Sequence, residues 1–217
     1  MTDNRFKAAI FDMDGLILDS EKAVIDCWEI VAERHGLEGI TEFAYSVIGR
    51  NVADTNRMFE EKYGTEPGAV AIRAEKRVLF WERFKEGLVP LKPYALELLQ
   101  TMKDRGMKIA LASSTSREDV VYEMEKLGAL SFFDAVICGD QVTKSKPDPE
   151  IFLKAADILG VKPSECIGLE DSFNGVRSCK AAGLYTVMVP DILQPDEEIA
   201  KLTDVIVKSL SDVAELL

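Results

Sequence analysis

Acidic side chains that directly follow short apolar runs are the first sign of chemistry in this sequence. Asp12 and Asp14 come at the end of the first apolar run, and Glu170 and Asp171 follow a later one. Four carboxylates brought together would repel one another strongly. A hard divalent cation removes that conflict, and Mg²⁺ binds oxygen ligands, commonly one or two carboxylates together with a substrate phosphate. Asp12 and Asp171 suit this role best, and the group predicts a magnesium site.

Hydroxyl groups and a lysine follow two other apolar runs. Ser113, Ser114 and Thr115 come after one run, and Lys146 lies in the loop after another. Each of these pieces alone has an ordinary structural explanation, such as a solvated turn, a helix cap or a loop. Their occurrence together, each after a predicted strand, favours a functional site.

Strands and helices alternate along most of the chain. This alternation indicates βαβ units with right-handed crossovers, and it predicts an α/β fold with a doubly wound parallel sheet, a Rossmann-like core. In such sheets ligands bind beyond the carboxyl ends of the strands, where the polar residues above would meet. The expected strands are 6–11, 107–112, 135–138, 166–169, 185–189 and 205–207, and the expected helices between them are 21–34, 91–105, 116–127, 148–159 and 173–182.

A helical block separates the first strand from the others. The stretch 41–87 has helical patterns and turn signals but no convincing strand. We therefore expect an α-helical cap domain at 18–87, inserted into a catalytic core that consists of 1–17 and 88–217.

Composition and charge limit the choice of partners. Apolar residues make up 47% of the chain and the net charge is −12, which argues against nucleic acids and anionic membranes, whose phosphates demand lysine and arginine. No run approaches the ~20 apolar residues of a membrane span.

The only histidine, His35, lies at a predicted helix end, so acid–base catalysis falls to carboxylates or lysine. None of the cysteines forms a CxxC pair, and the N-terminus has no leader-like stretch. Both features favour a reduced, cytoplasmic protein. We also expect a monomer.

Four segments in order, FDMDG, LASSTS, SKPDP and GLEDS, resemble the motifs of the haloacid dehalogenase superfamily, on its phosphatase and phosphomutase side. The resemblance runs from Phe11 to Pro190, and the combination of these motifs is highly specific. The helical block resembles the α-helical cap of the subfamily that includes β-phosphoglucomutase and sugar-phosphate phosphatases. The resemblance as a whole implies a Mg²⁺-dependent enzyme that acts on a small phosphorylated metabolite, and the expected class of substrate is a sugar phosphate.

The resemblance also implies a catalytic role for four residues. Asp12 would attack phosphorus and form an aspartyl phosphate. Asp14 would protonate the leaving oxygen and then deprotonate the attacking water. Ser113 would hydrogen-bond the phosphoryl group, and Lys146 would place a positive charge on it.

Metal and substrate ligands are implied in the same way. The metal ligands would be Asp12, Asp171 and the backbone carbonyl of Asp14, with Glu170 as a weaker candidate. The expected substrate-binding residues are Ser114 and Thr115, through backbone N–H groups where a helix begins, Arg117 just beyond them, and Arg50 and Lys76 in the cap.

The first cap helix bears on the choice between water and a sugar as the acceptor. In the mutase a histidine on this helix lies four residues before a tryptophan; here Trp28 matches, but Val24 takes the place of the histidine. We therefore favour a phosphatase, with a phosphomutase as the alternative. Asp14 argues against a dehalogenase, because carbon–halogen cleavage needs no proton on the leaving group. The presence of both Asp12 and Lys146 argues against a non-catalytic binding domain.

Overall fold

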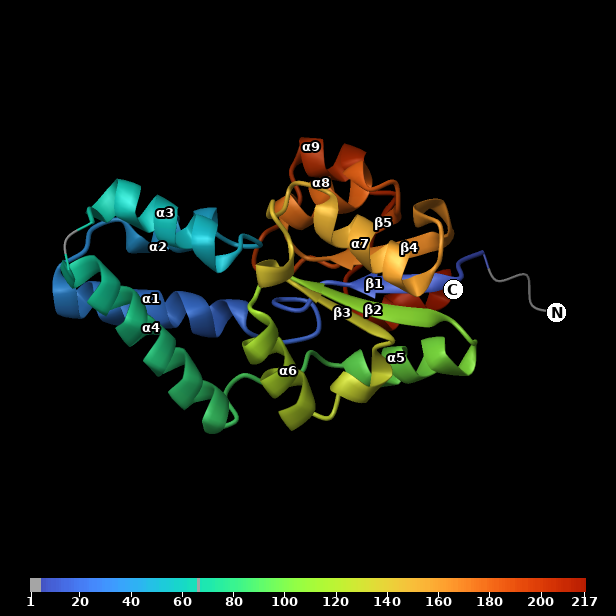
Figure 1. The fold of residues 1–217 in the computed structure, drawn as a ribbon, viewed down its shortest axis with the longest axis horizontal. Helices are drawn as coiled ribbons and strands as arrows, with labels where there is room; N and C mark the ends of the chain where they lie inside the picture. The colour runs from blue at the N-terminus through green and yellow to red at the C-terminus, as the bar shows by residue number, and fades with distance from the viewer. Residues whose placement is uncertain (1–4, 66) are drawn as a thin grey trace.

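A computed structural model describes residues 5–65 and 67–217 and shows a six-stranded, fully parallel sheet (Figure 1). The strand order is β3-β2-β1-β4-β5-β6, so the chain starts in the middle of the sheet and builds outward in both directions. The strands are β1 (Ala8–Phe11), β2 (Lys108–Ser113), β3 (Ala135–Cys138), β4 (Cys166–Glu170), β5 (Tyr185–Met188) and β6 (Val205–Ile206).

Helices cover both faces of this sheet, because its central strands are apolar on both sides. In β1, Ala8 and Ile10 pack into one buried cluster, whereas Ala9 and Phe11 pack into another. The first cluster includes α7 (Glu150–Leu159) and lies against α8 (Phe173–Ala181); the second includes α5 (Ala95–Asp104), α6 (Arg117–Lys126) and α10 (Leu210–Val213). Short elements complete this part: α9 (Glu197–Leu202) and the 3-10 turns Leu130–Phe132, Gly139–Gln141, Pro163–Glu165 and Ala214–Leu216.

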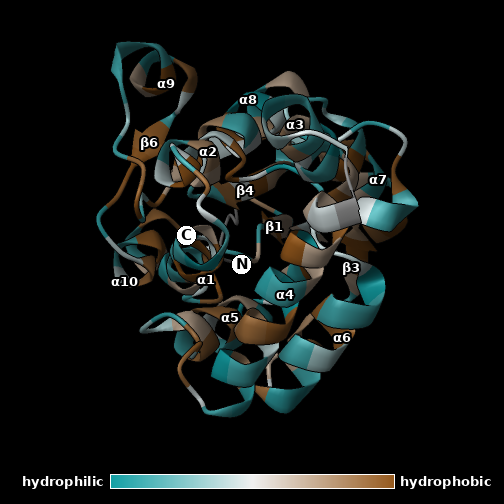
Figure 2. Cartoon of the chain, turned by 90° about the vertical axis from the view of Figure 1, so that its left-hand side faces the viewer, coloured by the Kyte–Doolittle hydropathy of each residue, from teal (hydrophilic) through white to brown (hydrophobic). Residues whose placement is uncertain are grey.

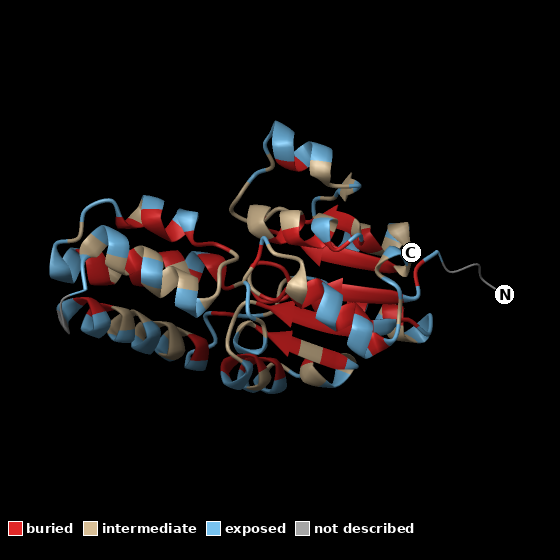
Figure 3. Ribbon diagram, turned by 45° about the horizontal axis from the view of Figure 1, so that its top comes forward, coloured by how far each residue is buried: buried red, intermediate tan, exposed pale blue. Residues whose placement is uncertain are grey.

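Four helices stand beyond the carboxyl ends of the strands (Figures 1 and 3). They are α1 (Glu21–His35), α2 (Ile40–Ser46), α3 (Val52–Tyr63) and α4 (Pro67–Lys85). Their own core holds Trp28, Phe43 and Phe59, with the Trp28 and Phe59 rings stacked at 5.2 Å. Seen from this side, α4 and α6 both carry many hydrophilic residues (Figure 2). We call α1–α4 the cap.

The expected α/β fold with a parallel sheet and a helical cap is confirmed, and the differences lie at element ends. The first strand begins at Ala8 rather than at residue 6, and the helix expected at 91–105 begins at Ala95. Leu91 instead forms a bridge to Leu18, so the two connections between cap and core run side by side. This pairing takes Leu91 out of the helix. The exact division at 18–87 stays a prediction.

Within the described residues, no helix is both long and apolar enough to cross a membrane.

Candidate active site

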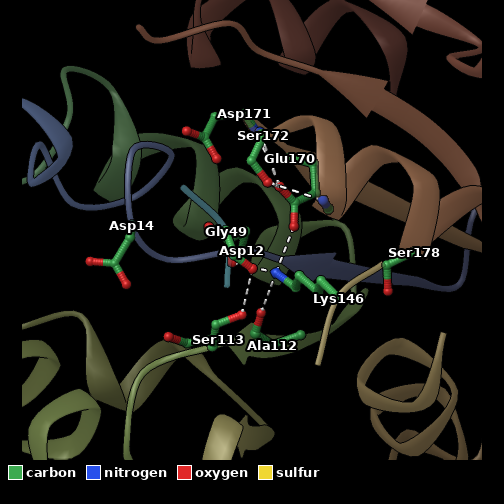
Figure 4. A network of polar contacts seen from close by, with 12 residues as sticks. Asp12, Asp14, Gly49, Ala112, Ser113, Lys146, Glu170, Asp171, Ser172 and Ser178 are labelled. Carbon is green, nitrogen blue, oxygen red and sulfur yellow. Dashed lines mark hydrogen bonds and ion pairs between the residues drawn. The ribbon is translucent and has the colours of Figure 1, made fainter. Parts of the chain in front are cut away.

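A buried lysine joins three of the strand ends. Lys146, in the loop after β3, lies with its Nζ atom 2.5 Å from Asp12 Oδ1, 2.6 Å from Glu170 Oε1 and 3.0 Å from the carbonyl oxygen of Ala112 (Figure 4). These partners come from the carboxyl ends of β1, β4 and β2. Only 1% of the Lys146 side chain is exposed. The two carboxylates raise its pKa against the opposing effect of burial, so the lysine stays cationic.

Asp12, Glu170 and Asp171 form an acidic cluster next to this lysine. One oxygen from each residue lies within 4.8 Å of the others, and all three residues are buried. Burial raises the pKa of Asp12 to about 8; Lys146 opposes this shift, and Glu170 and Asp14 add to it. Burial, followed by Asp12 and Glu170, also raises the pKa of Asp171.

The donor set of this cluster fits a magnesium ion. It offers carboxylate oxygens only, and their ionisation is opposed by burial and mutual repulsion, which a divalent cation would relieve. Gly15 lies directly against this cluster, because a Cβ atom there would lie 2.1 Å from Asp171 Oδ2. The loop after β1 therefore presses closely on Asp171.

Asp14 lies close in sequence but its side chain points elsewhere. Its Oδ1 accepts a hydrogen bond from Ser20 at 2.8 Å, and its Oδ2 accepts one from Thr115 at 2.9 Å. Figure 4 shows the carboxylate directed away from Asp171 and Lys146. The two aspartates of the first motif are thus separated, one beside the acidic cluster and one beside two hydroxyl groups.

Glu170 is held on both of its oxygens. Oε1 accepts from Lys146, and Oε2 accepts from the Ser172 hydroxyl at 3.1 Å and from the backbone N–H groups of Asp171 and Ser172 at 3.2 and 3.3 Å. A Cβ at Gly175 would lie 1.9 Å from its carboxyl carbon, so a helix backbone packs against it. Although Glu170 belongs to the acidic cluster, these contacts indicate a residue that positions Lys146.

The loop after β2 contributes hydroxyl groups, but in different directions. Ser113 is fully buried, and its Oγ accepts from the backbone N–H of Thr115 at 3.0 Å. Ser114 donates to the carbonyl oxygen of Gly49 in the cap at 3.0 Å. Arg117 does not reach the site: its guanidinium donates to the carbonyl oxygen of Val136 at 2.9 Å, and it is absent from the residues that line the cavity described next.

A cavity of about 420 Å³ lies between the cap and the strand ends. Asp12, Asp14 and Thr115 line its core side, and Arg50 and Lys76 line its cap side. Substrate binding by Arg50 and Lys76 stays a prediction. Several polar residues outside the predicted site also line it: Glu21, Thr55, Asn56, Arg73, Arg77, Asp119 and Glu123.

Two of these additional residues are buried glutamates. Burial, together with nearby carboxylates, raises the pKa of Glu21 to about 8 and that of Glu123 to about 9. Glu21 follows the first motif closely, so its place near the strand ends was open to inference. Glu123 lies four residues after Asp119, which puts both acids on one face of α6. Which face this helix turns toward the cap becomes evident only from the tertiary structure.

Comparison with known proteins places this geometry in a family. Residues 9–189 match the haloacid dehalogenase-like hydrolases. The chain is 32% identical over 185 residues to the phosphorylated carbohydrates phosphatase of Thermotoga maritima, covering 83% of each chain. It resembles CbbY from Rhodobacter sphaeroides in complex with phosphate, with a TM-score of 0.80, 26% identity and 96% of each chain covered.

A mutase is also among the similar structures. The chain matches β-phosphoglucomutase from Clostridium difficile with a TM-score of 0.79 and 28% identity, over 96% of this chain and 93% of that one. The curated relatives named phosphatases support the expected enzyme class, a phosphoric monoester hydrolase. With four motifs at one sheet edge and a family match over most of its length, the chain belongs to the haloacid dehalogenase-like hydrolase family.

Proposed function

We propose that this enzyme is a Mg²⁺-dependent phosphatase that hydrolyses a small phosphorylated metabolite, in the first place a sugar phosphate, through an aspartyl phosphate formed on Asp12. The separation of Asp12 and Asp14 carries the proposal. One carboxylate lies in the acidic cluster beside Lys146, and the other lies in the cavity between two hydroxyl donors. This arrangement lets Asp12 act as the nucleophile and Asp14 act as a separate acid at the same phosphoryl group.

Asp12 attacks the phosphorus atom, and Lys146 assists this step. A carboxylate oxygen of Asp12 bonds to phosphorus while the bond from phosphorus to the leaving oxygen breaks, and Lys146 carries positive charge beside the transferring group. Asp12, Asp171 and the backbone carbonyl of Asp14 would hold Mg²⁺, with Glu170 beside them. When bound, the ion supplies the positive charge that keeps Asp12 ionised and offsets charge on the phosphoryl oxygens.

Asp14 moves the protons. It donates a proton to the leaving oxygen in the first step and takes one from water in the second, when water attacks the phosphate on Asp12 and frees it. Ser20 and Thr115 hold its two oxygens toward the cavity. The cap lies over this region and forms one wall of the cavity that holds Asp14.

The likeness to β-phosphoglucomutase keeps a phosphomutase as the second candidate. A mutase shields its phosphoenzyme from water until a sugar hydroxyl arrives, and a polar contact from the first cap helix would help report that arrival. In this chain Val24 lines the cavity at that place and offers no hydrogen bond. We therefore propose net release of phosphate, without a bisphosphate activator.

Two assays separate these candidates. The first measures phosphate release from phosphorylated sugars, nucleotides and small acids, with and without Mg²⁺, and we expect Mg²⁺-dependent release from sugar phosphates. The second supplies β-glucose 1-phosphate with a trace of glucose 1,6-bisphosphate. Rapid formation of glucose 6-phosphate with almost no free phosphate would establish the mutase instead.

A further inference from the structure

Three buried side-chain polar atoms have no hydrogen-bond partner in the described part of the chain. They are Arg50 Nε, Arg73 Nη1 and Glu123 Oε2, and all three residues line the cavity below the cap. Buried polar atoms are nearly always paired, because leaving them unpaired is costly. Two arginine N–H groups and one carboxyl oxygen that lack partners around one cavity indicate a polar ligand that forms hydrogen bonds there.

Glu123 contributes the carboxyl oxygen of this set, and no neighbouring side chain in the described residues bonds to that oxygen. It belongs to α6 of the core and is 2% exposed. One turn earlier, Asp119 takes the nearby cation, because it pairs with Arg77 of α4 at 2.7 Å and also accepts a hydrogen bond from Ser116 at 2.8 Å. Lys76 of α4 lies instead over the rings of Trp28 and Phe80, at 5.6 and 5.7 Å.

The protonation state of Glu123 limits which chemical groups can bind to it. Burial, Asp14 and Asp119 raise its pKa to about 9 against the opposing effects of Arg77 and Lys76. At neutral pH the group is therefore a carboxylic acid, with one O–H donor and one acceptor oxygen. It does not repel a phosphate ester, and a hydroxyl group matches it. A hydroxyl group can pair with the buried Oε2 atom whether that atom carries the proton or not, whereas an anion can only accept a hydrogen bond and an alkyl group forms none.

We propose that Glu123 is a specificity-determining residue that hydrogen-bonds a hydroxyl of the leaving group, so that the enzyme selects phosphate esters of polyols or sugars. This inference rests on the proposed phosphatase function and adds to it the residue that recognises the substrate. The phosphoryl group would lie at Asp12 and Asp14, and the hydroxyl-bearing part would extend through the same cavity to α6, where Glu123 binds it.

The test compares two esters in several variants. For the parent, Glu123→Leu and Glu123→Gln, kcat/KM is measured for the best of ribose 5-phosphate, glucose 6-phosphate and sorbitol 6-phosphate, and for propyl phosphate. The ratio of the two values is expected to fall about 10- to 100-fold in Glu123→Leu, the effect of removing a buried hydrogen-bond partner. Glu123→Gln, which keeps a donor and an acceptor, should retain most of the ratio.

Glu125→Leu serves as the matched control, because Glu125 is exposed on the same helix and does not line the cavity. Its ratio should equal that of the parent. If Glu123→Leu does not fold, Glu123→Met, which keeps the length of the side chain, takes its place. A purely structural role would lower both kcat/KM values by the same factor.

Two results would overturn the inference while leaving the phosphatase standing. One is an unchanged ratio in Glu123→Leu; the other is a parent enzyme that prefers propyl phosphate or the anionic ester phosphoglycolate to every hydroxylated ester. A parent that releases phosphate from no ester, with Mg²⁺ present, would instead refute the proposed function itself and the inference with it.

Discussion

Lys146 shows how a charged group can be buried in this fold. Its ammonium has lost almost all contact with water, a cost that only close and complete pairing offsets. Two carboxylates and one carbonyl oxygen provide that pairing within 3.0 Å. Glu170 in turn is fixed by a serine hydroxyl and two backbone N–H groups. The lysine is thereby held at one place beside Asp12.

Asp14→Asn should slow proton transfer to the leaving group, because an amide cannot donate the proton of a carboxylic acid. We expect a loss of about 10²–10⁴-fold in phosphoenzyme formation from an alkyl phosphate. The loss should be much smaller for an aryl phosphate whose leaving group needs no proton. Rapid-quench measurement with both esters gives the comparison, and equal losses would exclude Asp14 as the acid.

Glu123→Gln should change how stability depends on pH. The pKa of Glu123 is about 9 in the folded protein against its usual 4.5, so unfolding releases a proton between these values and the parent loses stability as pH rises. The amide does not titrate. The melting temperature of Glu123→Gln relative to the parent should therefore increase from about pH 5 to about pH 8.

The groups that act on Glu123 stay in place in this experiment: Asp119 on its own helix, Asp14 from the loop after β1, and Lys76 and Arg77 from α4. Glu125→Gln, at an exposed position of α6, provides the control and should show no such trend. A difference in melting temperature that is the same at both pH values would contradict a raised pKa for Glu123.

At the scale of the elements, the loop between β1 and α1 sets the position of Asp171. Gly15 has φ +77°, and a Cβ there would lie 2.1 Å from Asp171 Oδ2. Gly15→Ala should destabilise the fold by about 1–2 kcal/mol through the backbone alone. It should also displace Asp171, so the Mg²⁺ concentration for half-maximal activity should rise.

Gly87→Ala is the matched control for this variant. Gly87 has nearly the same φ, +76°, but nothing lies within 4 Å of an added Cβ. It should share the loss of stability, measured by urea unfolding, without the change in Mg²⁺ requirement. Equal Mg²⁺ requirements in the two variants would mean that the contact between this loop and Asp171 does not matter.

The order of the elements was predictable from the sequence, but their contacts across the cavity were not. Four of the six strands are apolar runs followed by a polar motif, and this local pattern predicted the parallel sheet and the positions of Asp12, Asp171 and Lys146. Arg73 and Glu123 lie on helices that carry polar residues on more than one side. Which of these sides lines the cavity depends on how the cap packs against the core. Arg117 illustrates the same limit, since it bonds to Val136 instead.

For the whole molecule, magnesium should act as a folding ligand as well as a cofactor. Only the folded chain brings Asp12, Glu170 and Asp171 within 4.8 Å of one another. Mg²⁺ at about 100 times its Kd should add about 2.7 kcal/mol, which raises the melting temperature of a chain of this size by roughly 5–10 °C. Excess chelator should remove both the shift and the activity.

Asp171→Asn is the control for this effect, because it removes one ligand and little volume. Its melting temperature should respond much less to Mg²⁺ than that of the parent. Full activity after extensive dialysis against chelator would refute the metal requirement.

The central claim is that phosphate passes through Asp12. The most direct measurement is acid quench of the enzyme during turnover of its best substrate, followed by mass spectrometry of the peptide that contains residues 8–14. We predict a phosphorylated peptide with the group on Asp12, and its absence in Asp12→Asn, which should also lose steady-state turnover. Turnover retained in a pure Asp12→Asn sample checked for deamidation, with no phosphate on this peptide in the parent, would contradict the account.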